Sequence, residues 1–225
     1  MIRFDNVTKR YQTGLDALTE LSFEVGTGEI AFVTGHSGAG KSTLLKLVSL
    51  AERPTRGQIT VNGRDLARVR SGAIPLHRRG IGMVFQDHRL LTDRSVFDNV
   101  ALPLLIAGTA RAEIGKRVRA ALDKVGLLAR EKAAPVALST GEQQRVGIAR
   151  ALVAKPPLIL ADEPTGNLDP QLSLEIMNLF AEFGAVGTTV LIASHDLMLL
   201  KRMRRRVLVL DHGRLVDDFR PEAAA

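Results

Sequence analysis

Apolar residues near the start of this chain occur in short runs that are separated by turn-forming residues. The runs at 2–7, 18–25 and 30–34 are divided by Gly14 and by a Gly-Thr-Gly turn at 26–28. Short apolar runs bounded by glycine are typical of β-strands. We therefore predict three strands before residue 35.

Two further short strands are predicted before the pattern changes. Residues 58–61 lie between Gly57 and a tight Asn62-Gly63 turn, and residues 81–85 form a brief apolar run. A strand followed by Asn-Gly favours a hairpin. The first 86 residues are thus rich in strands.

The apolar pattern becomes helical from about residue 95. Ser95 is a suitable N-cap for a helix through 96–100, and Pro103 is expected to interrupt that helix. Residues 111–125 place apolar side chains on one helical face. We predict an inserted helical subdomain at 87–155.

Strand patterns return after residue 155. Residues 158–161 and 188–193 are continuous apolar runs, which are typical of strands buried on both faces of a parallel sheet. Residues 171–183 between them have helical spacing, and residues 206–219 form a predicted hairpin around a turn at 211–213. Strands alternating with helices predict an α/β fold.

The first predicted helix is preceded by a loop whose composition indicates phosphate binding. Residues 35–42 read Gly-His-Ser-Gly-Ala-Gly-Lys-Ser, between a strand and a helical run at 43–50. This is the P-loop spacing: backbone N–H groups converge on phosphates, Lys41 reaches the β and γ oxygens, and Ser42 offers a hydroxyl to Mg²⁺. The helix N-terminus adds a partial positive charge that favours an anion.

Candidate catalytic residues follow three of the predicted strands. Gln86, the pair Asp162-Glu163 and His195 each come directly after an apolar run. Ligands in open α/β sheets bind beyond the carboxyl ends of strands, so these side chains are expected to converge on the P-loop. Asp162 is suited to hold Mg²⁺ and Glu163 to accept a proton from the water that attacks a γ-phosphate. Taken singly, Gln86 is more simply explained as a loop residue and His195 as a structural residue, whereas the P-loop in the same chain disfavours a merely solvated acidic turn at Asp162-Glu163.

Two other features have both an ordinary and a functional explanation. Tyr11, after the first strand, is either a packing residue or an aromatic face for a purine base. Ser139 and Gly141 precede a predicted helix at 145–153. They form either a common helix cap or a second anion-facing helix start.

Composition and charge narrow the classes of function. The 225 residues include no cysteine, which excludes disulfides and thiolate metal sites. The start of the chain lacks a signal-peptide pattern, and the apolar runs fall short of the roughly 18 residues of a membrane span. Lys and Arg number 31 against 24 Asp and Glu. The dense basic patch at 201–206 is explained by a solvated helix end or by an anionic membrane surface. Nucleic acid is not expected, because the chain has no Trp and aromatics make up only 4%.

With these motifs in this order, the sequence resembles the nucleotide-binding subunits of ABC ATPases over essentially its full length. The resemblance implies a single ABC nucleotide-binding domain. Its P-loop NTPase (RecA-like) core, with an N-terminal antiparallel β portion, comprises 1–86 and 156–225, and its α-helical subdomain is 87–155. It also implies a head-to-tail homodimer in which Ser139 and Gly141 of one copy cover ATP bound by the other.

The resemblance assigns a role to each candidate residue. The implied nucleotide contacts are Tyr11, Gly35, His36, Ser37, Gly38, Ala39, Gly40, Lys41, Ser42, Thr43, Ser139, Gly141 and Glu142. The implied catalytic residues are Lys41, Gln86, Glu163 and His195; the implied Mg²⁺ ligands are Ser42, Gln86 and Asp162; the implied D-loop is Asn167-Leu168-Asp169.

Within this family, the segments 35–40, 85–91, 93–104 and 142–150 look most like members that act in bacterial cell division. That likeness implies an integral membrane partner of the FtsX type, attachment to the cytoplasmic face of the inner membrane at the septum, and ATP-driven control of septal peptidoglycan hydrolysis. The partner is expected to contact the segment 87–107.

Three alternatives share part of this pattern. An ATPase subunit of a lipoprotein-release or mechanotransmitting export complex has the same catalytic residues. A nucleotide-gated binding module hydrolyses ATP only incidentally, which intact Glu163 and His195 disfavour. A nucleic-acid-handling ABC ATPase commonly has two cassettes in one chain, whereas one set of motifs fills this sequence.

One position departs from the family pattern. The signature usually reads Leu-Ser-Gly-Gly, and Thr140 replaces the first glycine. A β-branched residue resists positive φ and crowds a close backbone approach. Thr140 is therefore expected to slow turnover or weaken the ATP-bound dimer, without abolishing activity, because Ser139 and Gly141 remain.

Overall fold

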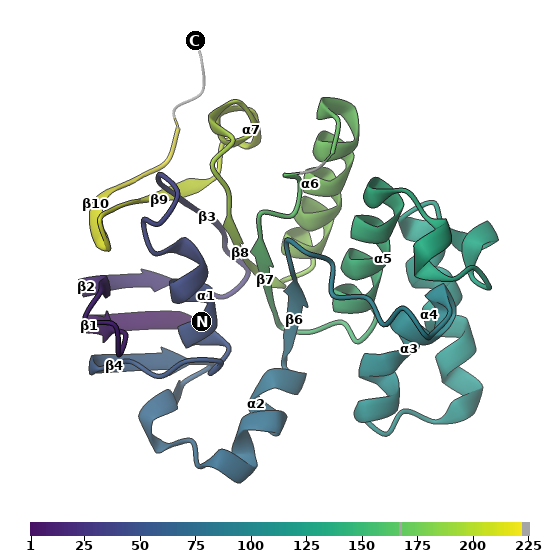
Figure 1. Cartoon of the computed structure of the whole chain (residues 1–225), viewed down its shortest axis with the longest axis horizontal. Helices are drawn as coiled ribbons and strands as arrows, with labels where there is room; N and C mark the ends of the chain where they lie inside the picture. The colour runs from purple at the N-terminus through teal and green to yellow at the C-terminus, as the bar shows by residue number, and fades with distance from the viewer. Residues whose placement is uncertain (167, 222–225) are drawn as a thin grey trace.

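The computed structural model of this chain describes residues 1–166 and 168–221 and is built around a central sheet (Figure 1). In the described residues this sheet has six strands in the order β10-β9-β3-β8-β7-β6. All neighbouring strands pair in parallel except β10, which pairs antiparallel with β9. The strands are β3 (Ile30–Thr34), β6 (Ile81–Val84), β7 (Leu158–Asp162), β8 (Thr189–Ala193), β9 (Arg206–Asp211) and β10 (Arg214–Phe219).

The central strands are buried on both faces, as their continuous apolar runs predict. In β3, Phe32 belongs to the apolar cluster on one face of the sheet, and Val33 belongs to the cluster on the other. Ile159 and Leu160 of β7 divide in the same way. Successive side chains of a strand point to opposite faces, so each strand contributes to both cores.

The N-terminal residues form a second, antiparallel sheet in the order β2-β1-β4-β5. Phe4 of β1 and Leu21 of β2 belong to the same apolar cluster as Leu44 of α1 and Val33 of the central sheet. The first helix is therefore packed between the two sheets. The strands are β1 (Ile2–Arg10), β2 (Asp16–Val25), β4 (Arg56–Val61) and β5 (Arg64–Asp65), and the helix is α1 (Lys41–Val48).

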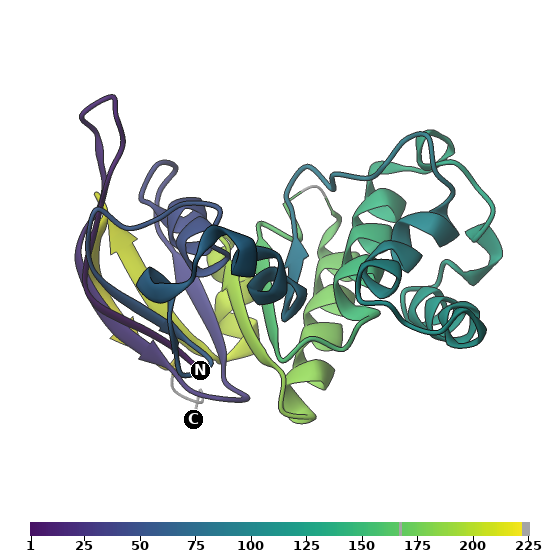
Figure 2. The same ribbon diagram turned by 90° about the horizontal axis from the view of Figure 1, so that it is seen from below.

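Three helices form a block at the end of the molecule opposite the antiparallel sheet (Figure 2). They come from the chain between β6 and β7, which is the segment where helical spacing replaces strand spacing. They are α3 (Val96–Ile106), α4 (Arg111–Lys124) and α5 (Thr140–Leu152). The remaining helices are α2 (Ile74–Arg79), α6 (Pro170–Ala185) and α7 (Leu197–Met203), with 3₁₀ turns at Leu66–Arg68, Ser71–Ala73, Leu128–Arg130 and Pro135–Ala137.

The expected interruption at Pro103 is wrong, because α3 continues to Ile106. Ser95 caps this helix as predicted, and its hydroxyl accepts a hydrogen bond from the Asp98 N–H at 3.1 Å. Proline inside a helix removes one N–H donor. Burial of the apolar face that includes Val100 and Leu104 offsets that loss.

The basic patch at 201–206 is divided between two elements. Lys201 and Arg202 lie in the last turn of α7, as a solvated helix end would. Arg206 instead begins β9 and forms ion pairs with Asp218 at 2.7 Å and Glu29 at 3.3 Å. The patch is therefore smaller than its sequence indicates. No helix among the described residues combines the length and the apolar character that crossing a membrane requires.

Candidate nucleotide site

The P-loop is held in one conformation by glycines that approach neighbouring backbone closely. Gly35 has φ +148°, and a Cβ atom there would lie 2.2 Å from the carbonyl oxygen of Leu210. Gly40, the residue before α1, has φ +107°, in the left-handed region that favours glycine. Lys41 Nζ donates to the backbone oxygens of Gly35 at 2.7 Å and His36 at 3.1 Å. The loop thus curls around the ammonium group of its own lysine.

Glu163 lies between the P-loop lysine and the histidine that follows β8. Its Oε1 atom is 3.9 Å from Lys41 Nζ and 2.9 Å from His195 Nδ1. The Glu163 backbone has φ 47°, a conformation rare for residues with a side chain, and its N–H donates to the Ala193 oxygen at 2.9 Å. Three of the four predicted catalytic residues therefore converge, although they are far apart in the sequence.

Ser42 and Asp162 form an oxygen-rich pair beside this group. The Ser42 hydroxyl donates to Asp162 Oδ1 at 3.0 Å. Burial raises the pKa of Asp162 above its usual range, and the charge of Glu163 acts in the same direction. A hydroxyl and a half-buried carboxylate are hard donors of the kind that Mg²⁺ prefers, and a cation would stabilise the charged form of Asp162. These two residues therefore fit the predicted Mg²⁺ site.

The fourth predicted catalytic residue, Gln86, follows the strand next to β7 and forms no hydrogen bond with this group among the described residues. Gln86 is exposed, two residues beyond Val84, and Val84 pairs with Ala161 of the adjacent strand. None of the hydrogen bonds among the described residues joins Gln86 to Asp162 or to Ser42. Gln86 therefore lies at the expected edge of the sheet, and its contacts with metal and water stay predictions.

Tyr11 lies against the beginning of the P-loop helix. Its hydroxyl is 3.4 Å from Thr43 Oγ1, and the ammonium of Lys9 is 4.9 Å from the centre of its ring. The aromatic residue is thus within the neighbourhood of the loop, and its stacking on a base stays a prediction.

The signature residues lie away from the P-loop. Figure 1 shows α5 and α1 on opposite sides of strands β6 and β7. Ser139 caps α5 and forms a capping box with Glu142: the Ser139 N–H donates to Glu142 Oε2 at 2.8 Å, and the Glu142 N–H donates to Ser139 Oγ at 3.3 Å. These bonds hold the pKa of Glu142 below its usual range. The exposed start of α5 therefore does not contribute to the P-loop site of its own chain.

The backbone argument made for Thr140 is wrong. Thr140 is the first residue of α5 and has a helical backbone, so no positive φ is required of it. Threonine is a tolerable residue at a helix start, and its side chain is exposed. Only crowding of a close approach remains as a reason for slower turnover.

Replacing Thr140 with Gly is accordingly expected to raise the ATPase rate modestly, by about two- to fivefold, because removing a side chain permits closer approach at the start of α5. Steady-state ATPase measurement on the two proteins at equal concentration tests this. A gain below about twofold would show that Thr140 does not restrain the enzyme.

Gln144 is a buried connection that sequence reasoning missed. Only 2% of it is exposed; its Nε2 donates to the Pro164 oxygen at 2.8 Å, and its Oε1 contacts Nδ1 of His88. Arg150, six residues further along α5, donates to the oxygens of His88 at 2.6 Å and Arg89 at 2.7 Å. The segment after Gln86 and the segment after Glu163 are thus joined through one helix. The sequence could have indicated this role, because Gln144 falls on the same face of the helix as its buried apolar residues.

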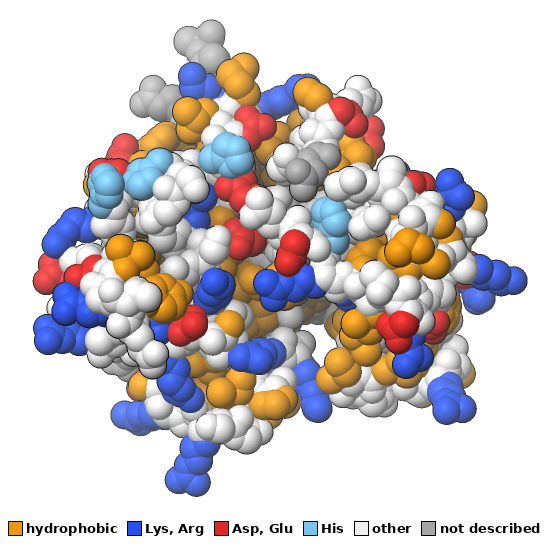
Figure 3. All heavy atoms as spheres, viewed as in Figure 1, with side chains coloured by type: hydrophobic (Ala, Val, Ile, Leu, Met, Phe, Trp, Pro, Cys, Tyr) orange, Lys and Arg blue, Asp and Glu red, His pale blue; other side chains and the backbone are white. Residues whose placement is uncertain are grey.

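A cavity of about 1140 Å³ opens beside Glu163 and His195. The start of α6 and the start of α7 contribute to its walls, and so do Leu168 and Pro170 from the predicted D-loop region. Asn167 of that predicted motif lies outside the described residues. Figure 3 shows acidic and histidine side chains together near the middle of this face, with Lys and Arg side chains both beside them and around the rim. An anionic ligand with a bound cation would match this arrangement.

Comparisons with known proteins relate nearly the whole chain to one family of ATP-binding proteins. A family model described as "ABC transporter" matches residues 18–166. The cell division ATP-binding protein FtsE of Escherichia coli K12 is 57% identical over 215 residues, which cover 96% of this chain and 97% of that protein. FtsE of Bacillus subtilis is 45% identical over 218 residues, covering 97% and 96%.

A solved structure has the same fold over the whole chain. It is the dimer of the ATP-binding cassette MJ0796 in a post-hydrolysis state with ADP and Pi, with a TM-score of 0.93, 32% identity and complete coverage of both chains. The predicted P-loop NTPase core with its antiparallel portion is thereby confirmed.

Proposed function

Since this chain belongs to the ABC transporter family and is an ATPase, we propose that it couples ATP hydrolysis to an FtsX-type membrane partner in bacterial cell division. The observation that carries the division role is the 57% identity with E. coli FtsE over nearly the full length of both chains. The proposal places the protein on the cytoplasmic face of the inner membrane, at the septum, where the partner's movement would regulate peptidoglycan hydrolysis.

The chemistry proposed for the site follows from its contacts. Lys41, which now bonds to two loop oxygens, would turn its ammonium toward the β- and γ-phosphates. Glu163 would accept a proton from the attacking water, and His195, 2.9 Å from Glu163, would hold that carboxylate and contact the γ-phosphate. Ser42 and Asp162 would hold Mg²⁺, which neutralises charge on the phosphates. Gln86 would report the state of the site to the helical subdomain at 87–155.

A second copy of the chain would complete the site. We assign Ser139, Gly141 and Glu142 to the partner copy's nucleotide, because α5 lies across the sheet from α1 within one chain. The first turn of a capped helix offers backbone N–H groups to an anion. The dimeric cassette MJ0796 supports this arrangement by its fold. ATP would then close the dimer, and hydrolysis would open it.

The proposed membrane partner needs an attachment surface, and α3 has exposed apolar residues. Leu105 is 54% exposed and Ile106 is 53% exposed, both at the end of α3, within the predicted contact segment 87–107. Exposed apolar residues grouped on one element are typical of interaction sites. Asn99 ties the same helix to the chain that follows Gln86, since its side chain bonds to Leu91 N at 2.8 Å and Leu91 O at 3.0 Å.

Replacing Leu105 with Ser is expected to weaken capture of a co-expressed FtsX-type partner about tenfold, because an apolar contact worth roughly 1.5 kcal/mol is lost. Co-purification from detergent extract measures this, with basal ATPase activity measured on the same protein. Val216→Ser, an exposed apolar residue of β10, is the control and should change neither quantity.

Equal capture of the partner by the wild type and Leu105→Ser would exclude α3 as the docking surface. If an export or lipoprotein-release membrane protein were captured in place of the FtsX-type partner, the division role would be wrong while the ATPase assignment would stand.

A further inference from the structure

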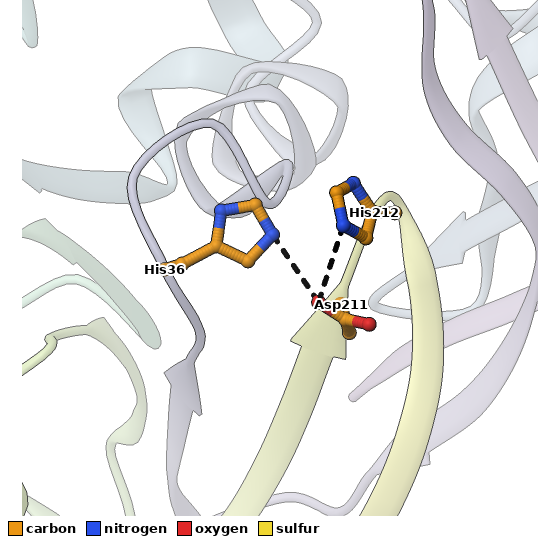
Figure 4. A group of neighbouring side chains, drawn as sticks. All are labelled: His36, Asp211 and His212. Carbon is orange, nitrogen blue, oxygen red and sulfur yellow. Dashed lines mark ion pairs between the residues drawn. The ribbon is translucent and has the colours of Figure 1, made fainter.

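Two histidines and a carboxylate meet at the outer edge of the P-loop (Figure 4). His36 comes from the loop itself, and Asp211 and His212 come from the turn between β9 and β10. Asp211 Oδ1 is 3.2 Å from His36 Nε2 and 3.9 Å from His212 Nε2. One ligand atom from each residue lies within 4.8 Å of the other two. The family resemblance implies that His36 contacts the nucleotide, but the catalytic steps proposed above use none of these three side chains.

The hydrogen bonding of His36 leaves an electron pair directed at the carboxylate. Its Nδ1 lies 2.6 Å from the Ser37 carbonyl oxygen, which only accepts, so Nδ1 carries the proton. In the neutral ring, Nε2 then presents its lone pair to Asp211 Oδ1. These two lone pairs, 3.2 Å apart, repel each other in the neutral ring, and a metal cation between them removes the repulsion in the way that a proton on Nε2 would. Bonding of the second ring nitrogen to a carbonyl is also the usual support of a metal-binding histidine.

The backbone already holds the two segments together. Gly213 N–H donates to the Ala39 oxygen at 3.2 Å, and Thr19 N–H donates to the Gly213 oxygen at 2.8 Å. His212 and Gly213 have φ of 44° and 76°, as the two central residues of a tight type I′ hairpin turn require. The three side chains are therefore brought together by the fold, and binding an ion would need side-chain rotation only.

We propose that His36, Asp211 and His212 form a binding site for a divalent transition-metal ion of the Zn²⁺ type, linking the P-loop to the β9–β10 turn. Two imidazoles and a carboxylate suit Zn²⁺ and not Mg²⁺. Tetrahedral bonds of about 2.1 Å separate ligand atoms by about 3.4 Å, close to the shorter observed spacing. Rotation of the His212 side chain, which is 83% exposed, would shorten its distances to the other two ligand atoms to the same value. Solvent completes the coordination. This site stands independently of the division role.

The test uses the full-length chain without a histidine tag and without nucleotide, because triphosphates chelate metal ions. Zn²⁺ is titrated by calorimetry in the presence of excess Mg²⁺, which occupies the hard oxygen donors. The wild type should bind one more equivalent of Zn²⁺ than His212→Asn or Asp211→Asn does, or should bind that equivalent about 100-fold more tightly. Loss of a residue that only orients a metal ligand weakens binding by about 10- to 100-fold, and loss of the ligand itself should cost at least as much. Asparagine keeps the turn at position 212, because it tolerates positive φ.

Asp217→Asn is the matched control, since it removes a carboxylate from the same hairpin outside the cluster. It should bind Zn²⁺ like the wild type. The same proteins are titrated with Co²⁺, whose visible absorption reports tetrahedral coordination. The proposed site would be overturned if the wild type and both cluster variants bound Zn²⁺ with equal stoichiometry and affinity. It would also be overturned if Asp217→Asn lost the same equivalent of Zn²⁺ as the cluster variants.

Discussion

Replacing Glu163 with Gln is expected to lower the ATP turnover rate by about 10²- to 10⁴-fold, the range that general base catalysis supplies. The amide keeps the shape of the side chain but has no basic oxygen for the proton of the attacking water. Nucleotide binding should persist, because Lys41 and the loop backbone are unchanged. Single-turnover ATPase measurement, with size-exclusion chromatography in ATP, should show a slow enzyme that accumulates as an ATP-bound dimer.

Glu175→Gln provides the matched control for that experiment. Glu175 is exposed on α6, so Glu175→Gln makes the same chemical change away from the site. Its turnover should equal that of the wild type. Should Glu163→Gln hydrolyse ATP at the wild-type rate, Glu163 is not the base, and the contact with His195 would be structural.

Mixing two inactive variants should restore activity if the site is shared between copies. Lys41→Ala loses the phosphate-binding ammonium, and Ser139→Phe fills the start of α5, where Ser139 is exposed. In a head-to-tail dimer, half of the randomly mixed pairs hold one intact site. About a quarter of wild-type sites should therefore return, from near zero for either variant alone.

ATPase activity of the equimolar mixture measures this recovery. The matched control mixes Lys41→Ala with Glu163→Gln, because both of those residues lie on the P-loop side of one chain and cannot complement each other. A mixture of Lys41→Ala and Ser139→Phe that stays as inactive as its components would place Ser139 outside the partner's site.

The sequence predicted most of the fold because its signals are local. Short glycine-bounded runs marked the strands, and the P-loop spacing placed Lys41 and Ser42 at the beginning of a helix. The convergence of Glu163 and His195 followed from one general rule, that parallel strands end at the same edge. Such inferences need only the order of elements along the chain.

The errors arose where tertiary packing decides the outcome. Pro103 stays inside α3 because the buried face of that helix outweighs a missing N–H donor. Backbone strain was predicted at Thr140, but Thr140 is the first residue of α5 and has a helical backbone. The exact start of a helix is poorly determined by sequence. The bonds of Gln144 to segments 20 and 56 residues away have no local signature.

The position of Gln144 constrains how this protein can move. One side chain joins the segment that follows Gln86 to the residue after Glu163, so a pivot of the helical block against the sheet strains or breaks its bonds. A pivot that breaks the bond to the Pro164 oxygen leaves a buried amide without its acceptor, at a cost of about 1–3 kcal/mol. Mechanical load applied at α3 would therefore reach Glu163, the proposed base, through Gln144 and Pro164, and force from the proposed membrane partner would change the hydrolysis rate.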